Sequence, residues 1–209
     1  MLGMALLHKA EIRPSKLELL SGWLPTLSWS SVSSGTEVSR VAAARFDDPA
    51  GAVGIEILLV RAGDGPVLQV PLTYRGAPLA GAERFLVGTT EHSVLGPRWV
   101  YDACGDPVFA SVLGDVIRTG AGQAAEEVHG DGRVVVRQPN LVLLGSGCDA
   151  PPVGEIRQVS DGEVTRIGTT AGTLEILRTP SSPAVAGEAV LTGKWADVET
   201  PLVLARLTS

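Results

Sequence analysis

Short apolar runs separated by glycine- and proline-containing turns are the feature that most constrains the fold of this chain. The pattern is clearest at 53–61 and 67–74, which flank the turn Ala62-Gly63-Asp64-Gly65-Pro66. Two runs at this spacing form an antiparallel hairpin, because glycine supplies the positive φ that tight turns need. With 25 Gly and 14 Pro among 209 residues, the sequence predicts many short strands joined by turns.

Further strands are expected in two groups, separated by the glycine-rich segment Thr119-Gly120-Ala121-Gly122. The first group adds 38–46, 85–88 and 98–104, and the second comprises 127–129, 134–137, 141–144, 155–159, 164–167, 173–177, 189–191 and 202–207. This grouping predicts a domain over residues 1–119 and a β-rich subdomain over residues 123–209.

Two helices are expected in the first domain. Ser15 and Glu18 form a capping-box pattern, and Pro25 predicts that this helix ends near Trp23. Asp106-Pro107 is typical of a helix start, and apolar residues then recur at helical spacing as far as Ile117. The expected fold class is therefore α+β: an antiparallel sheet with packed helices, followed by a smaller and mostly antiparallel β subdomain.

Charge and composition argue against several classes of protein. The net charge is −6 and no dense Lys/Arg run is present, which argues against nucleic-acid binding. No apolar stretch approaches the length of a membrane span, and residues 1–7 are too short for a secretory signal. The sequence therefore predicts a cytoplasmic protein in which Cys104 and Cys148 are free thiols.

Three motifs suggest chemistry but lack part of what it needs. His129-Gly130-Asp131 matches the start of a kinase catalytic loop, but Val136 stands where a metal-binding Asn belongs, so a hairpin turn is favoured. Gly145-Ser146-Gly147 resembles a dinucleotide loop, but Pro151-Pro152 argues against the helix that must follow. The histidines and cysteines have no zinc-ligand spacing, so no metal, cofactor or catalytic residue is predicted.

A candidate ligand-binding group remains around the last two expected strands of the first domain. It comprises Glu91, His92, Trp99, Tyr101 and Asp102. Trp99 and Tyr101 share one strand face, because side chains alternate, and such a pair can stack on a sugar. The alternative is a loop with satisfied hydrogen bonds and an aromatic pair at the edge of the core. Cys104 is expected to be a buried and inert thiol.

Several segments together resemble the N-terminal cap of actinobacterial maltokinases. They are Lys16–Leu20 with Trp23-Leu24-Pro25, then Leu59-Val60-Arg61 with Leu68–Arg75, and then Tyr101–Pro107. The resemblance covers roughly residues 10–118 and is greatest for stand-alone cap-like proteins. It implies a curved antiparallel sheet with packed helices.

Residues 123–209 resemble the β-rich intermediate part that follows this cap in the full kinase. Ile156–Thr165 is similar to a phosphate-loop hairpin, and Leu174–Arg178 to the strand that carries the nucleotide-binding Lys. Glu175 stands at the Lys position, where a carboxylate would repel phosphate groups. Because the chain ends at Ser209, the helical catalytic lobe is expected to be absent, which implies a pseudokinase-like protein.

Two hypotheses follow. The first is a non-catalytic, maltokinase cap-like module that binds a partner protein of sugar or α-glucan metabolism, in a maltose, trehalose or glycogen pathway. The second is a small enzyme or sugar-binding protein that acts on a glucan, sugar or sugar phosphate, motivated by polar residues 89–93 beside Trp99, Tyr101 and Asp102. The sequence favours the non-enzyme hypothesis, with a protein partner or a small sugar as ligand.

Overall fold

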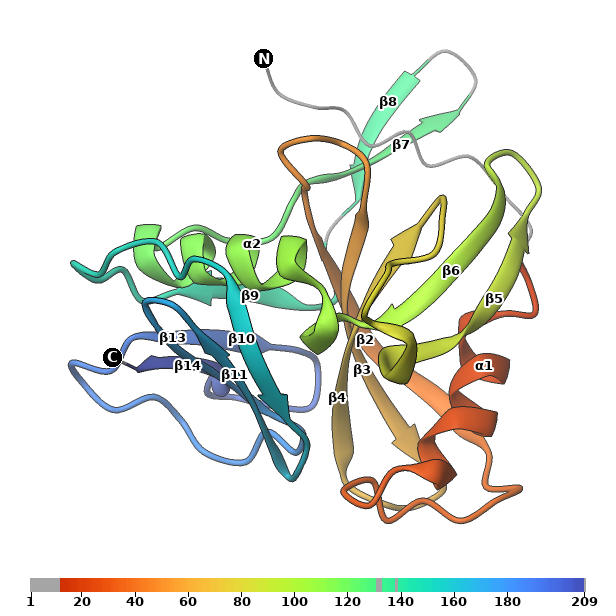
Figure 1. Cartoon of the computed structure of the whole chain (residues 1–209), viewed down its shortest axis with the longest axis horizontal. Helices are drawn as coiled ribbons and strands as arrows, with labels where there is room; N and C mark the ends of the chain where they lie inside the picture. The colour runs from red at the N-terminus through yellow and green to blue at the C-terminus, as the bar shows by residue number, and fades with distance from the viewer. Residues whose placement is uncertain (1–11, 131–132, 138, 209) are drawn as a thin grey trace.

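The computed structural model describes residues 12–130, 133–137 and 139–208, and within them it is mostly β (Figure 1). The described elements are two six-stranded antiparallel sheets, a two-stranded hairpin and two short α-helices. The first sheet has the order β1-β5-β6-β4-β3-β2, with β1 (Ile12–Arg13), β2 (Val38–Phe46), β3 (Gly54–Ala62), β4 (Val67–Arg75), β5 (Leu86–His92) and β6 (Gly96–Asp102). The second has the order β10-β11-β12-β14-β13-β9, with β9 (Val142–Gly145), β10 (Ile156–Ser160), β11 (Val164–Thr169), β12 (Gly172–Leu177), β13 (Val190–Lys194) and β14 (Leu202–Thr208).

The expectation of an α+β fold with packed helices overstated the helical part. The α-helices described are only α1 (Lys16–Trp23) and α2 (Pro107–Thr119), with single 3-10 turns at η1 (Leu24–Thr26), η2 (Glu83–Phe85) and η3 (Ala103–Gly105). The capping box and the Asp-Pro start located both helices correctly, but neither signal measures how much of the core a helix fills. The two sheets supply most of that core.

Helix α1 lies on the outer face of the first sheet, against β2 and β5. Its start is the predicted capping box, in which the Ser15 amide donates to Glu18 Oε2 at 2.7 Å and the Glu18 amide donates to Ser15 Oγ. Lys16 then anchors the helix to the sheet, because its Nζ lies 2.6 Å and 2.8 Å from the two oxygens of buried Glu56 on β3. The Tyr74 hydroxyl donates to the same carboxylate.

Strand β3 is buried on both faces, which explains its nearly continuous apolar sequence. One face contributes Leu58 and Val60 to a core shared with α1. The other contributes Ile57 and Leu59 to a larger core that also contains α2 and the inner face of the second sheet. Helix α2 contacts β9, β13 and β14 of that second sheet.

Helix α2 begins and ends as its sequence predicts. Asp106 is the N-cap, and its Oδ1 accepts from the Val108 amide, while Arg75 donates two hydrogen bonds of 2.7 Å to the same carboxylate. Gly120 ends the helix with φ of 70°, in the left-handed region that glycine adopts at no steric cost. Among the described residues, neither helix is long and apolar enough to cross a membrane.

The segment after α2 hydrogen-bonds to both sheets. Gly145 on β9 donates its amide to the carbonyl of Ala121, and Ala124 donates its amide to the carbonyl of Arg45 on edge strand β2. Asn140, beyond the hairpin, accepts from the amide of Ala43 on that edge. The proposed division between residues 119 and 123 stays a prediction.

The hairpin of β7 (Glu126–Gly130) and β8 (Arg133–Arg137) projects from the two sheets (Figure 1). Its strands pair antiparallel, with Gly130 opposite Arg133, which agrees with the predicted hairpin over the kinase-like alternative. Asp131 itself lies outside the described residues. The segment after β9 likewise shows no helix before β10 in the described part, as Pro151-Pro152 predicts.

Candidate functional site

The candidate residues Glu91 and His92 lie at the end of β5, beside the turn that leads into β6. Imidazole Nδ1 of His92 accepts from the amides of Val94 and Leu95 at 3.2 Å and 3.1 Å. Glu91 is exposed and lies opposite Pro97 on β6 and opposite Arg13 on β1. In this structure the His92 side chain shapes a hairpin turn, so a ligand contact here stays a prediction.

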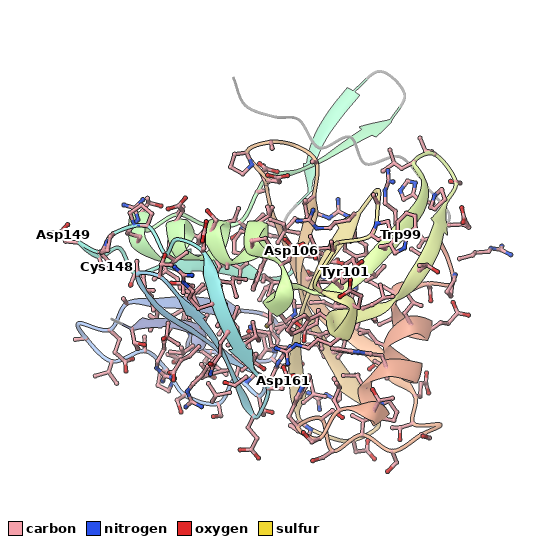
Figure 2. All side chains as sticks on the ribbon, in the orientation of Figure 1. Trp99, Tyr101, Asp106, Cys148, Asp149 and Asp161 are labelled. Atoms are coloured by element: carbon pink, nitrogen blue, oxygen red, sulfur yellow. The ribbon has the colours of Figure 1, made fainter. Side chains whose placement is uncertain are left out.

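Trp99 and Tyr101 share one face of β6, as the alternation of side chains predicts (Figure 2). Both pack around Phe85, and Tyr101 is only 2% exposed. The Tyr101 hydroxyl accepts from the Leu79 amide at 2.9 Å. The buried ring of Tyr101 offers no open face on which a sugar could stack, and its environment matches the alternative of a core edge with its polar atom bonded. Trp99 is only partly buried, so its contact with a ligand stays a prediction.

Asp102 ends β6 and is buried on the side of the second sheet. Its Oδ2 lies 2.5 Å from Nη2 of Arg178, which directly follows β12, and its Oδ1 accepts from the Cys104 amide. Asp102 and Arg178 are separated by 76 positions in the chain. The five candidate residues therefore have different surroundings: Glu91 is exposed on β5, His92 bonds within a turn, Trp99 and Tyr101 pack at a core edge and Asp102 forms a buried ion pair. Their role in ligand binding stays a prediction.

Arg178 is the polar residue that sequence reasoning missed. Its side chain is fully buried, its Nε donates to Thr165 Oγ1 at 2.9 Å, and its Nη2 also contacts Cys104 Sγ at 3.4 Å. The guanidinium lies 4.4 Å from the ring centroid of Trp29, a cation–π distance. We call this cluster the Arg178 clasp, and it joins the two sheets. It consists of Trp29, Asp102, Cys104, Thr165 and Arg178.

The backbone around Arg178 joins the sheets as well. The Gln69 amide on β4 donates to the Arg178 carbonyl at 2.7 Å, and Gln69 Nε2 donates to the Leu204 carbonyl on β14 at 3.3 Å. Cys104 is buried as expected, and its burial raises the pKa of the thiol well above its usual range. A thiol in this position is held protonated, which agrees with the prediction of an inert cysteine.

Glu175, at the position that the resemblance assigns to a nucleotide-binding Lys, lies on β12 directly opposite Arg166 on β11. The Arg166 Nε donates to Glu175 Oε1 at 2.9 Å, and both side chains retain solvent exposure. Glu175 also lies opposite Arg206 on β14. The second sheet therefore presents a cross-strand carboxylate–guanidinium pair at the position where the resemblance leads us to expect an ammonium group.

A cleft of about 380 Å³ opens at the junction of the two sheets. One wall is the serine-rich loop 29–33, the second is the β3–β4 turn 62–66, and the third consists of Glu163 and Thr179 from the second sheet. Ser30 holds the loop in place, because its hydroxyl lies 2.5 Å from the Leu24 carbonyl and accepts from the Val32 amide. Among the described residues, no group of three or more potential side-chain ligands could hold a metal ion.

These features define a mostly β protein in which two antiparallel sheets are joined by a buried ion pair. Residues 23–106 match the family model described as the maltokinase N-terminal cap domain, so this segment of the chain is maltokinase cap-like. The match begins in the last residue of α1, spans β2 to β6 and ends at the N-cap of α2, and it confirms the resemblance over this range. A search of curated proteins found no match.

Proposed function

We propose that this chain is a maltokinase-related module that acts by binding a partner or ligand and does not transfer phosphate. The ion pair between Glu175 and Arg166 carries the proposal. A nucleotide-binding strand needs a cation aimed at the phosphates, whereas here the strand presents a carboxylate, and this carboxylate is paired with an arginine of the neighbouring strand.

The cap-like segment supports a role in sugar or α-glucan metabolism. Its family is that of the maltokinase cap, so the partner is expected in sugar or α-glucan metabolism, as either a protein or a small sugar. Tyr101 and Asp102 are engaged in packing and in the clasp, which argues against a catalytic role for these two residues. A cytoplasmic location is part of the same proposal, and the unpaired Cys104 and Cys148 support it.

The first test is phosphate transfer. The full chain is incubated with labelled ATP, Mg²⁺ and either maltose or glucosamine, and the products are separated by chromatography. We expect no labelled sugar, and steady formation of a sugar phosphate would overturn the proposal.

The second test isolates the role of Glu175. Binding of MgATP is measured by calorimetry for the natural chain, for E175K and for E188K, which makes the same change of charge at another partly exposed carboxylate of this part of the chain. If Glu175 repels phosphate, E175K binds nucleotide more tightly than both others. Equal affinities in E175K and E188K would show that the position has no special effect.

A further inference from the structure

We propose that His92 is a pH-sensitive switch for the turn between β5 and β6, and that its neutral form holds the apolar pair Val94 and Leu95 in one arrangement. The turn lies at the outer end of the β5–β6 hairpin (Figure 1). The switch is separate from the proposed function, because it depends on the bonds of one turn and on neither phosphate transfer nor a bound partner.

The His92 imidazole bonds to the backbone of the turn that follows it. Its Nδ1 accepts hydrogen bonds from the amides of Val94 and Leu95, at 3.2 Å and 3.1 Å. Asn and Asp side chains commonly bond to turn amides in this way, whereas here a titratable ring takes their place. Gly96, which lies opposite His92, completes the turn with φ of 70°, in the left-handed region. The ring and the glycine together fix the shape of residues 93–95.

The two hydrogen bonds determine the state of the ring. A nitrogen that accepts from two amides must carry a lone pair, so the neutral ring of His92 has its proton on Nε2. When the ring takes up a second proton, Nδ1 becomes a donor and faces two other N–H groups, so both bonds are lost. Because an imidazole in water takes up this proton near pH 6.5, a change from pH 8 to pH 5 spans the transition.

The turn presents apolar side chains to solvent. Val94 is 56% exposed and Leu95 is 57% exposed. Among the described residues, these are the large apolar side chains that are both exposed and adjacent in the chain. Two hydrogen bonds to one ring keep the pair in a single arrangement, and their loss allows the backbone of the turn to sample others. The protonation of His92 therefore changes how this apolar surface is presented.

The neighbouring strands place no carboxylate on the face of β5 that carries His92. Directly opposite the ring, β1 contributes apolar Ile12 and β6 contributes Gly96. The next residue of β6 on this face is Arg98, whose Nη1 donates to the Pro97 carbonyl. Glu91 precedes His92 and so lies on the opposite face of the strand, where Arg13 of β1 is its cross-strand neighbour.

Helix α1, which also contacts β5, has its charged side chains bonded elsewhere. Lys16 bonds to Glu56, and Glu18 is held by Ser15 in the capping box. Among the described residues of β1, β6 and α1, no carboxylate is therefore placed to hold a protonated ring where the neutral ring lies.

NMR of the full chain tests the state of the ring and of the turn together. At pH 8, we expect the nitrogen signals of His92 to show a proton on Nε2. As the pH falls to 5, the amide signals of Val94 and Leu95 should shift with the same midpoint as the ring. Protection of these amides against hydrogen exchange should fall about fivefold, the factor that one typical hydrogen bond contributes. A proton on Nδ1 at pH 8, or amides that do not follow the ring, would overturn the proposal.

Two variants separate the proton from the acceptor. H92N is the matched control, because Asn can accept from turn amides but takes up no proton in this range, so protection of the Val94 and Leu95 amides should be the same at pH 8 and pH 5. H92A removes the acceptor and should show the low protection at both pH values. The other two histidines remain in both variants. A pH dependence that persists in H92N or H92A would therefore come from another group, and the switch would not be His92.

Discussion

The Arg178 clasp makes a quantitative prediction about how the two sheets stay together. Replacing Asp102 by Asn leaves the buried guanidinium without a counter-charge while keeping the size of the side chain. Removal of one partner from a buried ion pair typically costs about 3–5 kcal/mol, because the remaining charge is neither solvated nor paired. We expect D102N and R178M each to lower the free energy of unfolding by about this amount.

The double variant D102N/R178M separates the charge effect from lost packing. It leaves no charge in the clasp, so it should lose less than the two single variants together, by more than about 2 kcal/mol. It will not return fully to the natural stability, because Thr165 and Trp29 lose their contact with the guanidinium. Urea unfolding followed by far-UV circular dichroism at pH 7 gives all four free energies.

The partly exposed pair of Arg166 and Glu175 provides the control, since its atoms are also hydrogen-bonded, at 2.9 Å, but both side chains remain in contact with solvent. E175Q is expected to cost at most about 1 kcal/mol in the same assay. If D102N costs no more than E175Q, or if the costs of D102N and R178M simply add, the clasp does not hold the sheets together by a buried charge pair and our argument is wrong.

Two further predictions concern the first sheet and the seat of α2. Burial works to raise the pKa of Glu56, but the charge and hydrogen bonds of Lys16, together with the hydrogen bond from Tyr74, lower this pKa overall. Glu56 therefore stabilises the folded protein above its unfolded pKa of about 4.3, and this stabilisation is lost as the pH falls through the lower folded pKa. In urea unfolding measured from pH 7 to 3, E56Q should reduce the loss of stability at low pH. A Cβ at Gly145 would overlap the carbonyl oxygen of Val116 in α2, so G145A should lower the free energy of unfolding by about 1–3 kcal/mol. The control is G22A in α1, where an added Cβ would touch no neighbouring atom, so this variant should be neutral or stabilising by up to about 1 kcal/mol. Thermal or urea unfolding measures both.

Local signals in the sequence predicted the elements of this fold well. The capping box at Ser15 and the start at Asp106 depend only on neighbouring residues, so both helices begin where expected. The strand runs are likewise local, and most of their ends agree with the structure within a few residues. The helical part of the fold was overestimated because a helical pattern does not show how much of the core a helix fills: α1 has 8 residues and α2 has 13, and the two sheets supply most of the core.

The candidate site could not be predicted in the same way, because its determinants are distant in the chain. Asp102 looked like a ligand contact beside Trp99 and Tyr101, yet its partner Arg178 lies 76 positions away. A single arginine after a short strand carries no local sign that it will be buried. The cleft was missed for the same reason: its walls come from residues 29–36, residues 62–68, Glu163 and Thr179, which are distant in the chain.

The segment from Ala124 to Asn140 leaves and rejoins the molecule at one place on edge strand β2, where Ala124 bonds to Arg45 and Asn140 to Ala43. Its two ends are therefore fixed close together by bonds that do not involve the hairpin between them. The cost of closing a loop across fixed ends rises only slowly with its length. The β7–β8 hairpin is therefore a position where the chain should tolerate a shorter, longer or different insertion, while the bonds of Ala124 and Asn140 still cover the edge of β2.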